Sequence, residues 1–444
     1  MRESNCEIHG GGCQEKTKAL RHPRVKKWGD WRQSQKKRSC PVCITMATEP
    51  SPCKDEKNED TAARCFQQIK QWPKIMELLG EDKVPAAQLC ESFDTLSQIL
   101  QQTSDSLPEY SSTALDIVQK ILNIHISHIY HALNSNNDSS LIMSALNLLI
   151  AMVTYSQQAA RDVLSTVNFQ HGVFMAQVNR MDLKTEDDIR NCCIRLAMAF
   201  FVSGDNKLIK QFLTNKDFLK CFFKKLGHDR ACNIKLILVT LTQYLVCNPA
   251  VTKTEKLHIL NNYTLQQVAE LYVWKGTSEA MHDPNIDEDL QVLEIRQLCH
   301  QFLLKVTCDL KHGINFLDNS LGLSGKNYNS ILLKFLLSLH NATKDELMLE
   351  LVVQILHTCP DIVNQYLTQC KMSFQLRSSA SWLDNMEVLE QIMSGQSMIP
   401  SALLHAKNVS TGYMVQLAMT NTIPTVLTPV LLSQAVKVCI FVAV

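Results

Sequence analysis

The segment from Leu141 to Val153 decides the fold class. It reads Leu-Ile-Met-Ser-Ala-Leu-Asn-Leu-Leu-Ile-Ala-Met-Val, and its apolar residues recur at intervals of three and four. This spacing predicts a buried α-helix. The segment from Ile234 to Leu245 has the same character, and polar or glycine-containing joints such as Ser203–Asn206 and Gly227–Asp229 lie between such segments. The predicted repeating unit is a helix hairpin.

Length and composition favour an array of such units. A chain of 444 residues exceeds what one hydrophobic core usually spans. Hydrophobic residues make up 45%, whereas the 14 glycines and 13 prolines supply little turn chemistry for a sheet fold. We therefore predict an all-α, HEAT- or armadillo-like superhelix, with further helices at Tyr110–Leu133, Ile331–His340 and Asp345–Thr358. A turn and helix cap are expected at Asn134–Ser140.

Three regions are predicted along the chain. Residues 1–60 have few aliphatic residues and no helical period, so we expect a disordered head. Residues 61–437 carry the helical pattern, and residues 438–444 form an atypical apolar tail. The head carries a net charge of +7 over residues 1–39, which leaves −6 for residues 40–444 out of the total of +1.

The 17 cysteines are interpreted as small buried hydrophobes in a reducing compartment. Six of them lie inside apolar helical runs: Cys192, Cys193, Cys221, Cys247, Cys299 and Cys308. No secretory signal and no apolar run of membrane-spanning length is present in the sequence, so an intracellular protein without membrane contact is expected.

Two groups of basic residues are candidates for nucleic-acid contact. The first lies in the head and includes Lys26, Lys27, Lys36, Lys37 and Arg38. It suits a nuclear import signal or a phosphate-binding arm, and the alternative is a solvated tail without a partner. The second lies in the body and includes Lys207, Lys210, Lys216, Lys220, Lys224, Lys225 and Arg230. It suits a phosphate-binding face, and the alternative is the solvated edges of amphipathic helices.

Two groups of metal-ligand residues have a simpler interpretation. Cys6-x-x-His9 and Cys40-x-x-Cys43 have the ligand spacing of a zinc site, but the loop between them lacks packing residues, so free thiols are favoured. His125, His128 and His131 share a helix face, and a half-exposed histidine edge is favoured over a metal site.

The sequence contains no known catalytic or nucleotide-binding motif, so a non-enzymatic scaffold without cofactor or small-molecule substrate is predicted. An enzyme would require a pocket that gathers His125, His128 and an acidic partner. Stacked helical units present long surfaces that bind proteins or nucleic acids.

Several segments between residues 62 and 437 resemble the N-terminal domain of the nucleolar pre-ribosomal-associated protein 1 family, in the same order. They are Leu146–Val153, Ala159–Val163 with Phe169, Thr252–Lys256, Val268–Gly276, Leu310–Phe316, Leu351–Asp361 and Trp382–Asn385. The resemblance implies a helical scaffold in the nucleolus that acts in early maturation of the large ribosomal subunit. It also implies binding to pre-ribosomal RNA, to proteins of the pre-ribosomal particle and to an assembly complex that contains an RNA helicase.

Members of that family are several times longer, so we expect this chain to be a short or truncated form. The resemblance brings no catalytic or cofactor-binding residue. The alternative within the binding class is a cytoplasmic helical-repeat adaptor that binds proteins without RNA. The charge of −6 over residues 40–444 favours this alternative.

Overall fold

The fold is taken from a computed structural model of the chain. It describes residues 69–81, 84–105, 110–180, 188–276, 288–316, 327–339, 342–370 and 380–396, with isolated residues at 372, 429, 432, 433 and 436. Contacts divide the chain into two units, Met1–Asn58 and Glu59–Val444, and every described residue lies in the second. The regular elements of the described ranges are all helical, and none of those helices is long and apolar enough to cross a membrane.

The clearest repeating units contain three helices, one more than the predicted hairpin. In each unit a long first helix is followed by two short ones. The first complete unit is α6 (Ser139–Tyr155), α7 (Gln157–Thr166) and α8 (Gly172–Val178), and the second is α9 (Ile189–Ser203), α10 (Asn206–Phe212) and α11 (Lys216–Phe223). The third is α12 (Ala231–Thr240) with its π-helical extension η4 (Leu241–Val246), then α13 (Lys253–Lys256) and α14 (Asn262–Ala269).

The other described helices flank these three units. Residues 69–79 are helical, and the remaining bounds are α3 (Ala86–Asp105), α4 (Ser111–Asn123), α5 (Ile126–Ala132), α15 (Glu288–Cys308), α16 (Ser330–Ser338), α17 (Glu346–Thr358), α18 (Val363–Gln369) and α19 (Ala380–Gln396). Short 3₁₀ turns are η3 (Leu226–His228), η5 (Glu270–Val273), η6 (Ala342–Lys344) and η7 (Pro360–Ile362).

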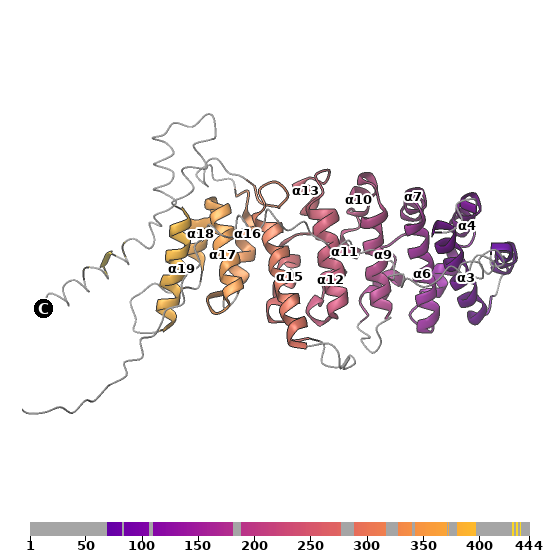
Figure 1. Ribbon diagram of the computed structural model, residues 1–444, viewed down its shortest axis with the longest axis horizontal. Coiled ribbons are helices and arrows are strands. Elements are labelled where there is room, and N and C mark those ends of the chain that lie inside the picture. The colour runs from indigo at the N-terminus through magenta and orange to yellow at the C-terminus, as the bar shows by residue number, and fades with distance from the viewer. Residues whose placement is uncertain are drawn as a thin grey trace, which may run out of the picture. The chain divides into compact units, whose positions relative to one another are not determined.

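Helices of the same rank pack against each other from unit to unit. The first-helix row is α3, α6, α9, α12, α15, α17 and α19, which lie side by side in that order (Figure 1). The second-helix row begins α4, α7, α10, and the third-helix row is α8, α11, α14, α16 and α18. This arrangement confirms the predicted all-α helical-repeat fold.

The first helices form the centre of the core. Because α6 packs between α3 and α9, it is enclosed on both sides, and from Leu141 to Val153 only Met143 and Asn147 are not fully buried. This explains an apolar run that continues all round the helix. Asp138 caps α6 by accepting a hydrogen bond from the Ser139 N–H, which confirms the predicted cap in Asn134–Ser140.

Between Ser111 and Asn248, several hydrogen bonds that join neighbouring units have similar sequence separations. Gln177 donates its Nε2 to the Leu133 carbonyl at 2.8 Å, 44 residues away. Tyr155 donates its hydroxyl to the Ser111 carbonyl, also 44 residues away, and Asn248 donates to Asn206, 42 residues away. These separations fit the period of about 40–47 residues of HEAT and armadillo repeats.

The predicted helix Tyr110–Leu133 is divided into two helices. The backbone leaves the helical path at Ile124 and His125, where α4 ends and α5 begins. The bend allows α5 to pack against α6 as well as α4. No glycine or proline marks this position, so the hydrophobic period alone did not reveal it.

Phe212 gives a test of the core. Its ring is fully buried and stacks on Phe200, with ring centroids 4.6 Å apart. We expect Phe212→Ala to lower the free energy of unfolding by about 3–5 kcal/mol, because a large cavity remains. Urea denaturation followed by circular dichroism measures the loss. The exposed Val202→Ala is the control and should stay within about 0.5 kcal/mol of the wild type; an equal effect of both would contradict this packing.

Asp205 gives a test of the links between units. It caps α10 by accepting from the Leu208 N–H, and it pairs with Arg161 of the preceding unit; both bonds lower the pKa of its carboxyl. Its stabilisation is therefore present above the unfolded pKa of about 3.9 and is lost as the pH falls through the lower folded pKa. Asp205→Asn keeps a capping side chain but removes the ion pair.

We therefore expect Asp205→Asn to melt below the wild type at pH 7 and to approach it at acidic pH. Thermal melts at both pH values measure the difference. A difference that stays constant with pH would show that the ion pair does not contribute.

Candidate nucleic-acid interface

The structure describes only one of the two predicted basic groups. Lys26, Lys27, Lys36, Lys37 and Arg38 lie outside the described residues, as do the four Cys and His residues with zinc-ligand spacing. The roles of the basic residues of the head and of the four Cys and His residues remain predictions. The lysines of the body, in contrast, lie within the described part.

The structure divides the body group into four parts. Lys216 is exposed at the start of α11. Lys207 and Lys210 lie on α10, in the second-helix row, and Lys210 pairs with Glu255 at 3.3 Å. Arg230 is buried. Lys220, Lys224 and Lys225 lie together at the end of α11, in the third-helix row, and only these form a candidate site.

Helix α11 presents these lysines because it is strongly amphipathic. Its apolar residues Phe218, Leu219, Phe222 and Phe223 are buried against the core. Lys220 is therefore directed to the opposite face, and Lys224 and Lys225 follow at the exposed C-terminal end. A cation at a helix C-terminus also has a favourable interaction with the helix dipole.

The turn after α11 has an unusual backbone. Lys225 has φ of 63°, the one positive φ of a non-glycine residue in the described ranges. A side chain in this left-handed region is disfavoured by about 1–2 kcal/mol, so other contacts must hold the turn. One of them is the Lys225 N–H, which donates to Gln267 Oε1 of α14 at 3.3 Å.

The main support of the turn is a buried ion pair between Arg190 and Asp229. Arg190 donates through Nε and Nη2 to the two carboxylate oxygens of Asp229, each at 2.6 Å. The two side chains are 1% and 0% exposed. Bidentate geometry makes this one of the stronger kinds of ion pair.

Arg190 also binds three backbone carbonyls. Nη1 donates to Val178 O at the end of α8, and Nη2 donates to Phe222 O and Lys224 O at the end of α11. These carbonyls lie at helix C-termini, where they lack partners within their own helices. One guanidinium thus fixes α8, α9, α11 and the lysine turn with respect to each other.

The protonation of the pair follows from its burial. Burial raises the pKa of Asp229, and the hydrogen bonds and charge of Arg190 oppose that rise. Burial lowers the pKa of Arg190, but Asp229 more than compensates, so the guanidinium pKa is raised. Arg190 therefore stays charged.

The sequence carries a signal for the burial of Arg190. Arg190, Ile194, Ala197 and Phe201 follow the spacing of one helix face, and the last three are apolar. A charge on an apolar face predicts a buried partner. It does not predict which carboxylate, because Asp229 lies 39 residues away.

Two further lysines turn inward and are thereby unavailable for an external ligand. Lys256 donates to the Val246 and His312 carbonyls at 2.7 and 2.9 Å, and Lys253 donates to the Leu310 carbonyl at 3.0 Å. Burial lowers the pKa of both. They fix the loop after α15 to the preceding unit.

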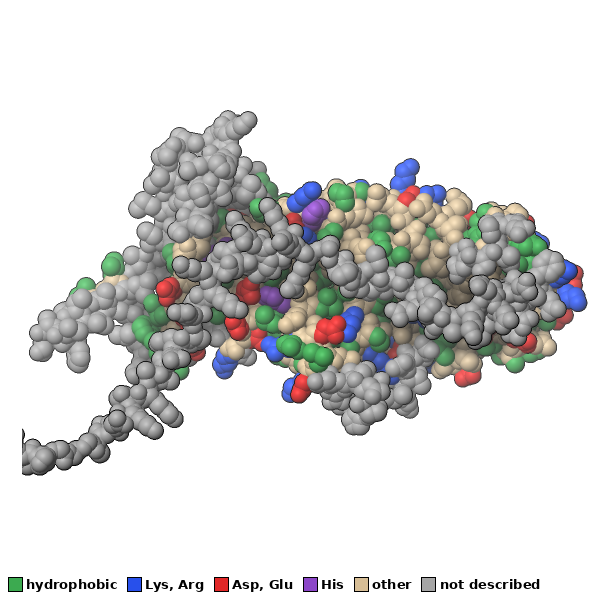
Figure 2. Space-filling view, viewed as in Figure 1, with side chains coloured by type: hydrophobic (Ala, Val, Ile, Leu, Met, Phe, Trp, Pro, Cys, Tyr) green, Lys and Arg blue, Asp and Glu red, His purple; other side chains and the backbone are tan. Residues whose placement is uncertain are grey.

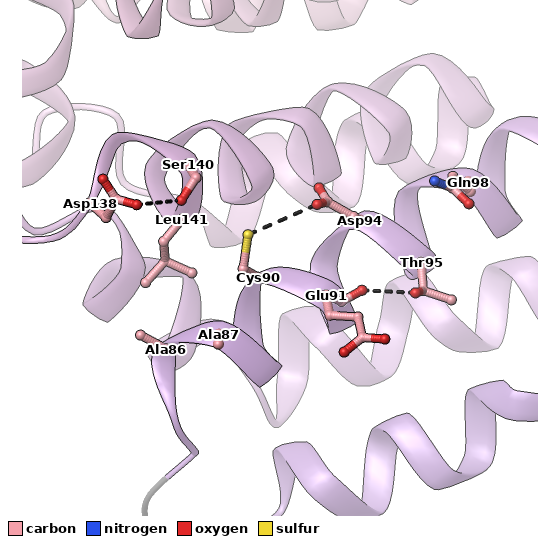
Figure 3. Close-up of a pocket in the computed structure, with 10 residues that line it drawn as sticks. All are labelled: Ala86, Ala87, Cys90, Glu91, Asp94, Thr95, Gln98, Asp138, Ser140 and Leu141. Atoms are coloured by element: carbon pink, nitrogen blue, oxygen red, sulfur yellow. Dashed lines mark hydrogen bonds between the residues drawn. The ribbon is translucent and has the colours of Figure 1, made fainter.

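An open acidic groove lies between α3 and α6. It has a volume of about 580 Å³, and Glu91, Asp94 and Asp138 line it together with Cys90 and Ser140 (Figure 3). The thiol of Cys90 lies 3.9 Å from Asp94 Oδ2, and Ser140 donates to Asp138. These bonds involve the carboxylates of Asp94 and Asp138.

The histidines lie outside this groove. His125 and His128 have ring centroids 6.0 Å apart. His128 Nε2 is 2.9 Å from the Leu79 carbonyl, and burial, followed by the charge of His128, lowers the pKa of His125. His131 is exposed. Within the described ranges no group of three or more His, Cys, Asp or Glu side chains is placed to hold a metal ion.

This chain is similar to known proteins. A family model described as Ribosome 60S biogenesis N-terminal (Npa1) matches residues 75–385, which include the repeating units and the Arg190–Asp229 pair. The chain belongs to this family. The matched segment of this Npa1 family begins after the basic head and contains Lys220, Lys224 and Lys225.

Two relatives carry the name Nucleolar pre-ribosomal-associated protein 1. The chain is 33% identical over 367 residues to Nucleolar pre-ribosomal-associated protein 1 of Homo sapiens, which covers 82% of this chain and 16% of that protein. It is 32% identical over 366 residues to the protein of that name from Mus musculus, with the same shares. The chain thus spans about 16% of the length of these Npa1-family relatives.

The ion pair gives a test of how the lysine turn is held. Arg190→Met leaves Asp229 buried without its cation, and we expect a loss of about 3–5 kcal/mol in the free energy of unfolding. Arg190→Met combined with Asp229→Leu should recover part of that loss, because no unpaired charge remains. Urea denaturation measures both variants.

Arg161→Met is the matched control, because it removes a partly exposed arginine from its pair with Asp205. It should cost no more than about 1 kcal/mol. If the double variant is as unstable as Arg190→Met alone, the unpaired charge is not the cause of the loss.

Proposed function

We propose that this chain is a non-enzymatic helical-repeat scaffold in the assembly of the large ribosomal subunit. The family match over residues 75–385 carries the proposal, since that family is described as acting in 60S biogenesis. The relatives are named as nucleolar and pre-ribosomal-associated. We therefore place the chain in the nucleolus, bound to pre-rRNA and to proteins of the pre-ribosomal particle, including a complex that contains an RNA helicase.

The role of a scaffold is supported by how the chain uses its polar side chains. Gln177, Arg190 and Lys256 all donate to backbone carbonyls of neighbouring units or loops. Such bonds keep successive helices in register, so that the exposed edges of the rows form continuous surfaces. Continuous surfaces of this kind suit the binding of long partners.

A cytoplasmic protein adaptor of the same architecture is the second candidate. The charge of −6 over residues 40–444 favours it, because a net negative body repels RNA at long range. Figure 2 shows acidic and basic side chains interspersed on the face in view. The local positive charge at the end of α11 favours the first candidate.

Sedimentation with ribosomal precursors separates the two candidates. We expect the tagged chain to sediment with large-subunit precursors, to crosslink to pre-rRNA and to give a nucleolar signal. Lys220→Glu combined with Lys224→Glu should lower the crosslinked RNA several-fold without unfolding the chain, because both side chains are at least partly exposed. A cytoplasmic signal without precursor RNA would support the adaptor.

A matched variant controls for charge alone. Lys74→Glu combined with Lys207→Glu makes the same change of charge at exposed positions outside the third helices of the units. It should retain most of the crosslinked RNA. Equal losses in both variants would mean that overall charge, and not the α11 surface, governs RNA contact.

A further inference from the structure

The third-helix row carries positive charge, although the body as a whole is negative. Among the described residues, helices α8, α11, α14, α16 and α18, taken with two residues beyond each end, expose only Asp217 and Glu270 as acidic side chains. The exposed or partly exposed basic side chains of the same segments are Arg180, Lys216, Lys220, Lys224, Lys225 and Lys334. The row is therefore a basic surface, which attracts anions.

Few basic side chains of this row form an ion pair within the described part of the chain. Ion pairs that join different units use other helices or the joints between them: Arg161–Asp205, Lys210–Glu255, Lys235–Glu294 and Arg296–Asp345. On the third-helix row the described ion pair is Lys220–Asp217, at 3.6 Å within one helix. Lys224, Lys225 and Lys334 have no carboxylate partner in the described part of the chain.

Exposed aromatic rings occur on the same row. Tyr263 is the second residue of α14 and is 43% exposed, and Tyr328 precedes α16 and is 48% exposed. They are the two aromatic residues classed as exposed among all described positions. Both belong to the row that carries the free lysines, at the starts of two helices that pack together.

Helix α14, which carries Tyr263, packs against α11, which carries Lys220. The pKa of the Tyr263 hydroxyl is raised by burial, and then by Glu270 and Cys221. Cys221 is adjacent in sequence to Lys220, and one helical turn after Tyr263 the side chain of Gln267 accepts from the Lys225 N–H. The exposed ring of Tyr263 therefore lies on the helix next to the one that carries Lys220.

We propose that the third-helix row binds single-stranded RNA, with Tyr263 and Tyr328 stacking on bases and Lys220, Lys224, Lys225 and Lys334 contacting phosphates. This inference rests on the proposed function, which supplies the class of partner. Stacking on exposed aromatic rings requires unpaired bases, because the bases of a duplex are already stacked on one another. An acidic peptide would occupy the lysines but would leave the rings without a matching group.

Binding by the purified full chain to a labelled oligouridylate of about 12 nucleotides tests the proposal. We expect Tyr263→Leu and Tyr328→Leu each to weaken binding by about tenfold, from the usual contribution of a stacked base. Tyr263→Phe and Tyr328→Phe keep the ring and should stay within about twofold. Both tyrosines are exposed, so thermal melting should be unchanged in all four variants.

The salt dependence tests the lysines. The plot of log affinity against log salt has a negative slope. Lys224→Glu should reduce the magnitude of that slope by about 0.7, the value for one phosphate contact on a single strand. Lys207→Glu makes the same change on exposed α10, in the second-helix row, and should leave the slope unchanged. A duplex of about 16 base pairs should bind more weakly than the single strand.

Three results would overturn the RNA site: equal affinity of the Leu and Phe variants, equal salt slopes for the two lysine variants, or tighter binding of the duplex. Those results leave the scaffold role standing if the chain still sediments with large-subunit precursors. Loss of that sedimentation in the wild type would instead overturn the proposed function. The two failures are therefore distinguishable.

Discussion

The buried ion pair between Arg190 and Asp229 is the interaction on which the centre of the array depends. Removing two charges from water is costly, and only complete hydrogen bonding offsets that cost. Here the guanidinium donates to both oxygens of one carboxylate and to carbonyls from α8 and the end of α11. The Phe222 and Lys224 carbonyls lie at the end of α11. The ion pair therefore fixes the turn that carries Lys224 and Lys225.

The same solution recurs in other units with different residues. Gln177 binds the carbonyl of Leu133, and Lys256 binds those of Val246 and His312. In the C-terminal units Tyr272 and His300 are joined at 2.9 Å, and His300 lies 3.4 Å from Glu350. In these examples a polar side chain forms a hydrogen bond with a polar group of a neighbouring helix or loop. Hydrophobic contact supplies most of the remaining stability.

The sequence predicted the fold well because burial follows from pattern. The run Leu141–Val153 required a helix enclosed on all sides, and helical arrays provide such positions. It predicted less of the candidate site. Lys224 and Lys225 were identified as basic, but their separation from Lys207 and Lys210 depends on which helix row each joins, and hydrophobic spacing does not encode that. The partners of Arg190 and the exposure of Tyr263 depend likewise on contacts between distant segments.

The bonds between units join neighbours along the array. Within the described ranges, bonds such as Tyr155 to Ser111 and Asn248 to Asn206 each cross one joint, so bending at that joint does not strain a distant one. A pull or twist is shared in small increments among all the joints, so none of them needs to break. This construction suits an array that bends gradually over many joints instead of at one hinge.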